Sequence, residues 1–184
     1  TIKGYANFLT DYDAIAPRII FWQGNKYNIE GFLYFCTVLW INNTYCPNTI
    51  APLKMIEMKH NSNEQALMDG KRWPDIPWVS YSGYNFNGDG QLFYPGKTQY
   101  ELWPSIRLIN IRDGIEDYEY LYQLKQLKDD MLSNDLKKRK EYCLNAFNLF
   151  VNDFKTYENN PEKLLELKRN AGLILQDSKR YSDK

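Results

Sequence analysis

Apolar positions recur along this chain at two different spacings, which predicts a mixture of helices and buried strands. Residues 18–28 fit a short amphipathic helix with a polar stop at Asn28, whereas residues 31–40 are almost continuously apolar, aromatic or β-branched. Such a run is typical of a strand buried on both faces of a parallel sheet, and a buried helix segment is the alternative. Its length and the glycine at its start favour the strand.

A second strand is predicted over residues 91–94, after a glycine-rich turn, and a helix of about 27 residues is predicted from Pro104. Proline suits the first position of a helix because its missing N–H has no partner there. The helix would bury an apolar stripe that comprises Leu108, Ile111, Ile115, Tyr118, Leu121 or Tyr122, Leu124 and Leu127.

Two further helices are predicted near the C-terminus, over residues 135–157 and 161–178, the second capped by Asn160. The inward positions would be Leu136, Cys143, Phe147, Phe150 and Phe154 on the first, and Leu164, Leu167, Ala171 and Ile174 or Leu175 on the second. The expected organisation is therefore a strand-and-helix region over residues 1–130 and a helical hairpin over residues 131–184 packed on it. Residues 42–87 between the strands are irregular, with one short helix expected at 53–59.

Charge and composition exclude several functional classes. The chain has 23 basic and 23 acidic side chains, so it lacks the positive field that nucleic-acid binding requires. With three cysteines and one histidine, no metal site is expected. The longest apolar run is too short for a membrane span, which needs about 20 residues. The basic run at 137–140 is interpreted as a solvated helix face.

Aromatic residues make up 16% of the chain, including 15 tyrosines and 5 tryptophans. Two interpretations are open: a large aromatic core with tyrosine hydroxyls at its edge, or a cleft whose rings stack on the apolar faces of sugars. Composition alone favours the core.

Four segments of the chain are specific enough to be compared with known families. They are Asp11–Ile15 with Arg18–Gln23, then Lys26–Tyr34, then Asn87–Gly90 with Tyr94–Gly96, and finally Ser105–Arg107 with Arg112–Leu121. They span about two thirds of the chain. Their wording and order resemble the C-terminal part of the catalytic region of glycoside hydrolase family 123 and its relatives.

The resemblance implies an α/β fold in which this chain supplies the last two βα units of a TIM-like (β/α)8 barrel. It also implies retaining hydrolysis of β-linked N-acetylgalactosaminides, in which the acetamido oxygen of the substrate attacks the anomeric carbon. In that family an Asp orients the acetamido group and the next residue, a Glu, is the general acid/base. No cofactor is implied, the ligand would be an N-acetylhexosamine glycan, and an extracytoplasmic location is expected.

The chain departs from the family at the catalytic pair, because it contains no Asp-Glu dipeptide. Glu116-Asp117 has the reverse order and is predicted to lie on a helix. The favoured hypothesis places the pair on an upstream barrel segment, and because the chain begins at Thr1 we expect a processed or truncated protein. The alternatives are a catalytically silent barrel that binds glycans or a protein partner, and one subunit of a split barrel.

Four residues are predicted to contact substrate, and each has a structural alternative. Trp40 ends the first predicted strand and could stack under a sugar, or pack in the barrel. Asp89 lies between two glycines, where it could face a ligand or cap turn N–H groups. Tyr94 ends the second strand, near the cleft of a barrel. Trp22 is the weakest candidate, because helix packing explains it as well. The charged cluster at 112–121 is interpreted as a structural ion-pair network.

Overall fold

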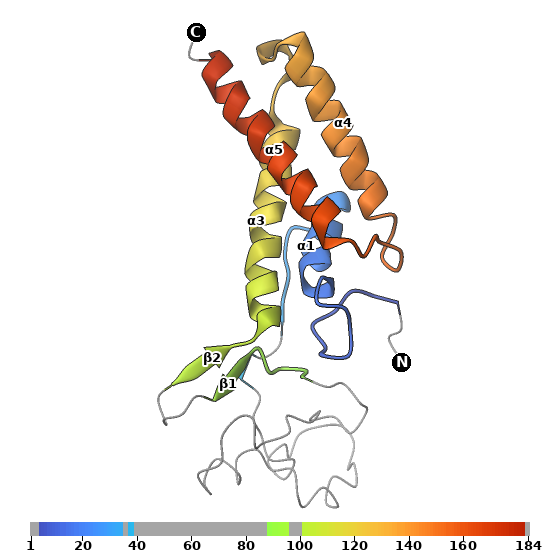
Figure 1. Ribbon diagram of the computed structural model, residues 1–184, viewed down its shortest axis with the longest axis vertical. Helices are drawn as coiled ribbons and strands as arrows, with labels where there is room; N and C mark the ends of the chain where they lie inside the picture. Colours follow the sequence, from blue (N-terminus) through green and yellow to red (C-terminus); the bar gives the residue numbers. More distant parts are fainter. Residues whose placement is uncertain (1–3, 35–36, 39–87, 96–100, 183–184) are drawn as a thin grey trace, which may run out of the picture. The chain divides into compact units, whose positions relative to one another are not determined.

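The computed structural model describes residues 4–34, 37–38, 88–95 and 101–182, which form a mixed helix and sheet structure that is mostly helical (Figure 1). The helices are α1 (Ala16–Lys26), α3 (Ile106–Gln126), α4 (Asn134–Phe150) and α5 (Pro161–Ser182), with a 3₁₀ turn at Asp129–Met131. Strands β1 (Phe93–Pro95) and β2 (Leu102–Pro104) form the sheet. No helix of these residues is long and apolar enough to cross a membrane.

The chain divides into two compact units. The helical unit comprises Thr1–Asn7, Ile15–Phe32 and Asn110–Lys184, and the hairpin unit comprises Phe8–Ala14 and Leu33–Ile109. Helix α3 begins in the hairpin unit and continues into the helical unit. The predicted division of the chain at residue 130 stays a prediction.

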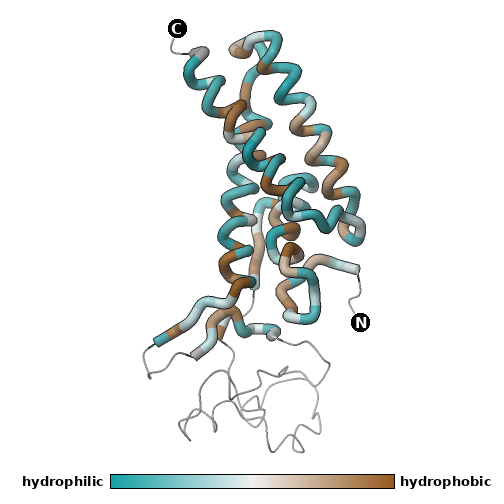
Figure 2. The backbone as a smooth tube through the Cα atoms, in the orientation of Figure 1, coloured by the Kyte–Doolittle hydropathy of each residue, from teal (hydrophilic) through white to brown (hydrophobic). Residues whose placement is uncertain are grey.

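The helical unit is built on the apolar stripes of its helices, which alternate with polar positions along α4 and α5 (Figure 2). One buried cluster comprises Ile19, Trp22, Leu121, Phe147, Phe150, Val151 and Leu164. A second comprises Leu124, Leu132, Leu136, Cys143, Ala171 and Ile174. Helices α4 and α5 pack on one another. Burial of the apolar side chains of these two clusters is the main favourable contribution to folding of the helical unit.

The ends of the helices agree with the sequence signals in part. Asn160 caps α5 as predicted, because its Oδ1 accepts a hydrogen bond from the Lys163 N–H at 3.1 Å. Helix α1 ends at Lys26, and Asn28 follows with a left-handed φ of 53°. The Lys26 ammonium donates to the carbonyls of Asn148, Val151 and Asn152 at the end of α4, where backbone acceptors have no helical partner.

Helix α4 ends at Phe150, so its predicted extension to residue 157 is wrong. The Asp153 carboxylate accepts hydrogen bonds from the backbone N–H groups of Lys155 and Thr156, each at 2.7 Å. These bonds form a local turn that competes with the helix, and they lower the pKa of Asp153. Phe154, predicted to point inward, is 43% exposed as a result.

The predicted start of α3 at Pro104 is also wrong. Pro104 pairs with Phe93 in the sheet, and the helix begins at Ile106 after Ser105, whose hydroxyl accepts from the Leu108 N–H at 3.3 Å. The predicted stripe is only partly buried, since Ile115 and Tyr122 are about half exposed. The buried positions of α3 are Arg107, Gly114, Asp117, Leu121 and Leu124, which include two charged residues.

The sheet differs from the prediction in its pairing. Strand β1 pairs with β2 in antiparallel register, Tyr94 opposite Trp103, and the sequence pattern had not indicated β2. The strand predicted over residues 31–40 is wrong for residues 31–34, which have no strand conformation, and Leu33 is 91% exposed. Val38 makes a single antiparallel bridge to Gln91. Residues 35–36 and 39–40, and the predicted helix at 53–59, lie outside the described residues.

The strand prediction failed for a physical reason. An apolar run indicates that its side chains are buried, but it does not specify which segment of the chain packs against them. A strand exists only where a neighbouring strand accepts its backbone hydrogen bonds. Whether this chain forms part of a barrel therefore stays a prediction. The predicted mixture of helices and strands is confirmed, and the described structure is mostly helical.

Candidate functional site

The turn at Gly88-Asp89-Gly90 is the centre of a polar cluster in the hairpin unit. Gly88 and Gly90 have φ values of 76° and 69°, a conformation that side chains other than glycine rarely adopt. The Gln91 N–H donates to the Gly88 carbonyl at 3.1 Å and closes the turn. Leu92 and Phe93 then donate to the carbonyl of Thr37, which leads the chain into β1.

Arg107, in the first turn of α3, is 4% exposed and holds the Gly88–Gly90 turn through its guanidinium. Its Nη1 donates to the carbonyls of Phe8 and Gly88, both at 2.6 Å. Its Nη2 donates to the carbonyl of Gln91 at 2.5 Å and to the Tyr94 hydroxyl at 3.2 Å. The planar guanidinium thus fixes three backbone positions and one side chain at once.

Tyr34 also binds this turn. Its hydroxyl donates to Asp89 Oδ1 at 3.1 Å and accepts from the Gly90 N–H at 2.6 Å. Its ring packs edge-on against Phe8, with the ring centroids 4.9 Å apart. Burial, with the nearby Asp89 carboxylate, raises the pKa of Tyr34 to about 12, so it stays a hydrogen-bond donor at neutral pH.

Two predicted substrate residues therefore lie in one cluster. Asp89 is half-buried and accepts from Tyr34, and Tyr94 is half-buried and contacts Arg107. The contacts favour a role in holding the turn, and a contact with substrate stays a prediction for both. Trp40 lies outside the described residues.

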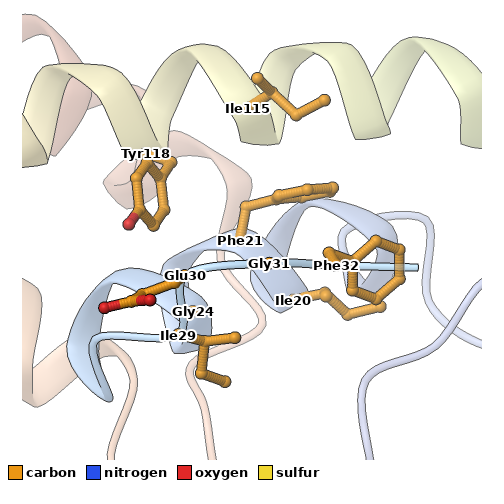
Figure 3. A pocket seen from close by; sticks show the side chains of 9 residues that line it. All are labelled: Ile20, Phe21, Gly24, Ile29, Glu30, Gly31, Phe32, Ile115 and Tyr118. Atoms are coloured by element: carbon orange, nitrogen blue, oxygen red, sulfur yellow. The ribbon is translucent and has the colours of Figure 1, made fainter.

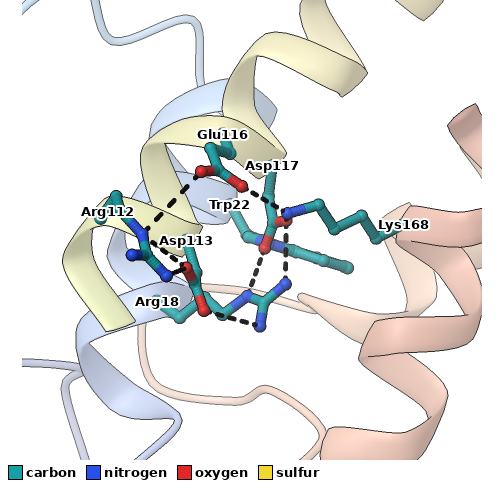
Figure 4. Close-up of polar contacts among 7 residues, drawn as sticks. All are labelled: Arg18, Trp22, Arg112, Asp113, Glu116, Asp117 and Lys168. Atoms are coloured by element: carbon teal, nitrogen blue, oxygen red, sulfur yellow. Dashed lines mark hydrogen bonds and ion pairs between the residues drawn. The ribbon is translucent and has the colours of Figure 1, made fainter. Parts of the chain in front are cut away.

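A second polar cluster lies in the helical unit around Asp117, which is 1% exposed (Figure 4). Arg18 donates to it from Nε at 2.5 Å and from Nη2 at 3.0 Å, one bond to each carboxylate oxygen. The Trp22 indole N–H donates to Oδ2 at 2.9 Å, and the Lys168 ammonium lies 3.2 Å from Oδ1. Four donor atoms from two helices, α1 and α5, thus surround one carboxylate on α3.

Charged side chains extend this cluster toward solvent. Lys168 also donates to Glu116 at 3.0 Å, and Arg112 contacts Asp113 at 2.7 Å and Glu116 at 3.9 Å. Burial lowers the pKa of Lys168, but its bond to Glu116 and the Asp117 charge outweigh that effect and raise it. The bond to Asp113 likewise raises the pKa of Arg112. The ion-pair network predicted for residues 112–121 is confirmed.

Trp22, the fourth predicted substrate residue, belongs to this cluster. It is 1% exposed, and its ring packs against Phe147 and Phe150 with centroids 4.8 and 5.1 Å away. Its environment favours the packing interpretation, and stacking on a sugar stays a prediction.

Neither cluster has the arrangement of a nucleophile with a general base. Both oxygens of the Asp117 carboxylate accept hydrogen bonds, and both terminal nitrogens of Arg107 donate to two acceptors each. Cys143 is buried, which raises its pKa to about 11 and keeps it a poor nucleophile. The described residues contain no group of three or more His, Cys, Asp or Glu that could hold a metal ion.

Sequence reasoning missed Arg18, Tyr34 and Lys168 as members of these clusters. One signal was present: Arg107, Gly114, Asp117, Leu121 and Leu124 follow one another at spacings of three, four and seven residues, so they share a helix face. A charged residue on this buried helix face indicates that a partner of opposite charge or a hydrogen-bonding group is buried beside it. The sequence does not show which residue that partner is.

Comparison of the chain with models of known protein families gives no match, and comparison with curated proteins gives none either.

Proposed function

We propose that this chain is the C-terminal, non-catalytic portion of a glycosidase-like protein of the family 123 type. The whole protein would hydrolyse β-N-acetylgalactosaminides with retention, using the acetamido group of the substrate and an Asp-Glu pair outside this chain. The portion described above would position the strands and loops that face the substrate.

One observation supports this proposal most directly: the four segments that carry the resemblance bond to one another. Arg18 of the first segment binds Asp117 of the fourth. Tyr34 of the second segment binds the turn of the third at Asp89 and Gly90. The same turn is held by an arginine of the fourth segment through the Gly88 carbonyl.

Four motifs that occur in order and also bond in pairs are better explained by a shared fold than by chance. The bonds also explain why these residue types are needed. Each pair joins a buried charged or hydroxyl group to its partner, and a buried polar group that loses its partner costs about 1–3 kcal/mol. The motifs thus support a shared fold more strongly than they support the proposed hydrolysis.

The test is an assay of the natural protein on a chromogenic β-N-acetylgalactosaminide. The matched control substrate is the corresponding β-galactoside, in which a hydroxyl replaces the acetamido group. Substrate assistance requires hydrolysis of the first and at least about 1000-fold slower hydrolysis of the second, because removing the internal nucleophile removes the route. Equal rates on both substrates would exclude this mechanism.

A second assay locates the catalytic pair. The 184-residue chain alone should not hydrolyse the acetamido substrate, because it has no Asp-Glu dipeptide. Hydrolysis by the chain alone would contradict a catalytic pair outside it.

The absence of the dipeptide also favours one rival, a barrel that binds glycans without hydrolysing them. Binding of N-acetylgalactosamine by a natural protein that turns over neither substrate would support that rival.

A further inference from the structure

The helical unit has an apolar pocket of about 220 Å³ (Figure 3). Its lining comes from α1, from residues 29–32 directly after α1, and from α3. No residue of either polar cluster described above lines the pocket, which shares only helices α1 and α3 with them. The pocket therefore needs an explanation of its own.

Three aromatic side chains line the pocket: Phe21, Phe32 and Tyr118. The rings of Phe21 and Phe32 are inclined at 61° with centroids 5.6 Å apart, so they form two walls rather than one flat stack. Phe32 is 52% exposed, and the neighbouring Ile29 and Ile115 are 42% and 48% exposed. The pocket is thus open to solvent while its walls are apolar.

The polar groups of the lining side chains gather at one end. In Figure 3 the Glu30 carboxylate and the Tyr118 hydroxyl lie at the opposite end of the pocket from Phe32, with Phe21 between them. Among the described residues that line the pocket, Glu30 is the only charged one. Among the described residues it makes no ion pair, in contrast to Glu116 and Glu158. The pocket thus combines three aromatic side chains with one carboxylate that has no ion pair among the described residues.

We propose that this pocket binds a small alkylated ammonium ion of the choline type. The faces of aromatic rings carry negative potential and attract organic cations, and several rings around one site are the known means of recognising quaternary ammonium groups. The Glu30 carboxylate adds a full negative charge, and the isoleucines accommodate the methyl groups. Phosphate and carboxylate ligands are disfavoured, because the lining offers them no cation.

A sugar fits this pocket less well. A pyranose carries several hydroxyls, and each one buried without a hydrogen-bond partner costs about 1–3 kcal/mol. Among the described residues, the lining side chains offer Glu30 and the Tyr118 hydroxyl as partners. The inference is therefore independent of the proposed glycosidase function.

The experiment titrates the folded 184-residue chain with choline and, separately, with its neutral carbon isostere, in which a tert-butyl group replaces the trimethylammonium group. Both have the same shape, so the difference in their dissociation constants measures recognition of the charge. Chemical-shift changes in the protein spectrum at fixed ionic strength give both constants. We expect choline to bind at least about tenfold more tightly. Equal binding would overturn the proposal and leave a general apolar pocket.

Two variants at exposed positions test the residues without disturbing the core. Glu30→Gln and Phe32→Leu should each weaken choline binding by about 3- to 30-fold, and Glu30→Gln should leave binding of the isostere unchanged. The matched control is Glu141→Gln, which removes an exposed carboxylate from α4, outside the pocket. Choline binding that is unaffected by both pocket variants would overturn the assignment to this site.

A peptide containing trimethyllysine, titrated in parallel, distinguishes a free ligand from a modified protein. A small ligand is supported when choline binds at least as tightly as the peptide. A peptide that binds more than about tenfold more tightly than choline would overturn the small-ligand assignment in favour of a protein partner.

Discussion

The two polar clusters each bury an arginine, but they neutralise its charge in different ways. Arg18 in the helical unit is bound on two nitrogens by the carboxylate of Asp117. Arg107 in the hairpin unit is bound by three backbone carbonyls and a tyrosine hydroxyl. Among the described residues, no carboxylate lies within ion-pairing distance of Arg107.

The different partners of the two arginines indicate different structural roles. In the first cluster the buried charges of Arg18 and Asp117 neutralise each other, so losing either one removes the main counter-charge of its partner. In the second, one cation is solvated by backbone dipoles, so the geometry of the guanidinium determines the path of the backbone. The first cluster therefore joins helices, whereas the second shapes a loop.

The largest effect is expected from breaking the first cluster at its centre. Asp117→Ala leaves the cations of Arg18 and Lys168 without the carboxylate that they share, and should lower the free energy of unfolding by about 3–5 kcal/mol. Urea denaturation of the 184-residue chain measures this. Glu119→Ala, two residues along the same helix and exposed, is the matched control and should change stability by less than about 0.5 kcal/mol. A loss below about 1 kcal/mol in Asp117→Ala would show that the cluster is not a mutually dependent pair.

Replacing each arginine by lysine sharpens the comparison. Lysine keeps the charge but has no planar fork, so Arg107→Lys should lose contacts to several acceptors and cost about 2–4 kcal/mol. Arg18→Lys keeps a cation beside Asp117 and should cost about 1–2 kcal/mol. The two variants are compared in the same denaturation assay. If Arg18→Lys were the more damaging, charge would matter less than guanidinium geometry in the helical unit, contrary to our interpretation.

The turn that Arg107 holds should be sensitive to a single methyl group. A Cβ at Gly88 would lie 2.5 Å from Arg107 Nη1 and 2.7 Å from the Thr10 methyl carbon, at a φ that favours glycine. Gly88→Ala should therefore cost about 1–3 kcal/mol. Gly31→Ala is the control, because a Cβ there meets no atom within 4 Å, and a change below about 0.5 kcal/mol is expected. Similar melting temperatures for the two variants would argue against a tightly held turn.

The smallest expected effect is a pH dependence confined to the hairpin unit. Tyr34 is protonated in folded and unfolded chains below its ordinary pKa near 10. Because its folded pKa is raised to about 12, its contribution is complete below pH 10 and is lost as pH rises through about 12. After allowance for partial solvent exposure, this contribution is about 1 kcal/mol. Tyr34→Phe should remove this part of the alkaline decline in stability.

The control for this measurement is Cys143→Ala. Burial raises the pKa of Cys143 to about 11, so its ionisation should lower the stability between pH 9 and 11. Cys143→Ala should remove this second loss of stability, and Tyr34→Phe should leave it intact. Identical profiles for Tyr34→Phe and the unmodified chain would mean that the hydroxyl ionises without affecting folding.

Much of the helical structure could be predicted from the sequence, because its signals are local. The capping role of Asn160 and the apolar spacing of Leu136, Cys143, Phe147 and Phe150 depend only on residues within a few positions. The error at Phe154 also has a local cause, since the Asp153 turn ends the helix earlier. The sheet was predicted less well, because the partner of a strand lies at a distance that no local pattern specifies.

The candidate site divides in the same way. The sequence indicated that the Gly88–Gly90 turn and the cluster at 112–121 are polar centres, because glycine and charged residues stand there at informative spacings. It gave no means of finding Arg18 or Tyr34, whose partners lie 99 and 55 residues away. The pocket of Phe21, Glu30 and Tyr118 was missed for the same reason.

The sequence by itself determined the presence and the starts of the two C-terminal helices and the neutral overall charge. Only the tertiary structure decided that Asp117 is a buried acceptor for four donors and that Arg107 binds backbone carbonyls. Helix periodicity follows from bonds between residues four positions apart, so it is visible in the sequence. The neutralisation of a buried charge depends on which distant groups reach it, and folding of the whole chain decides that.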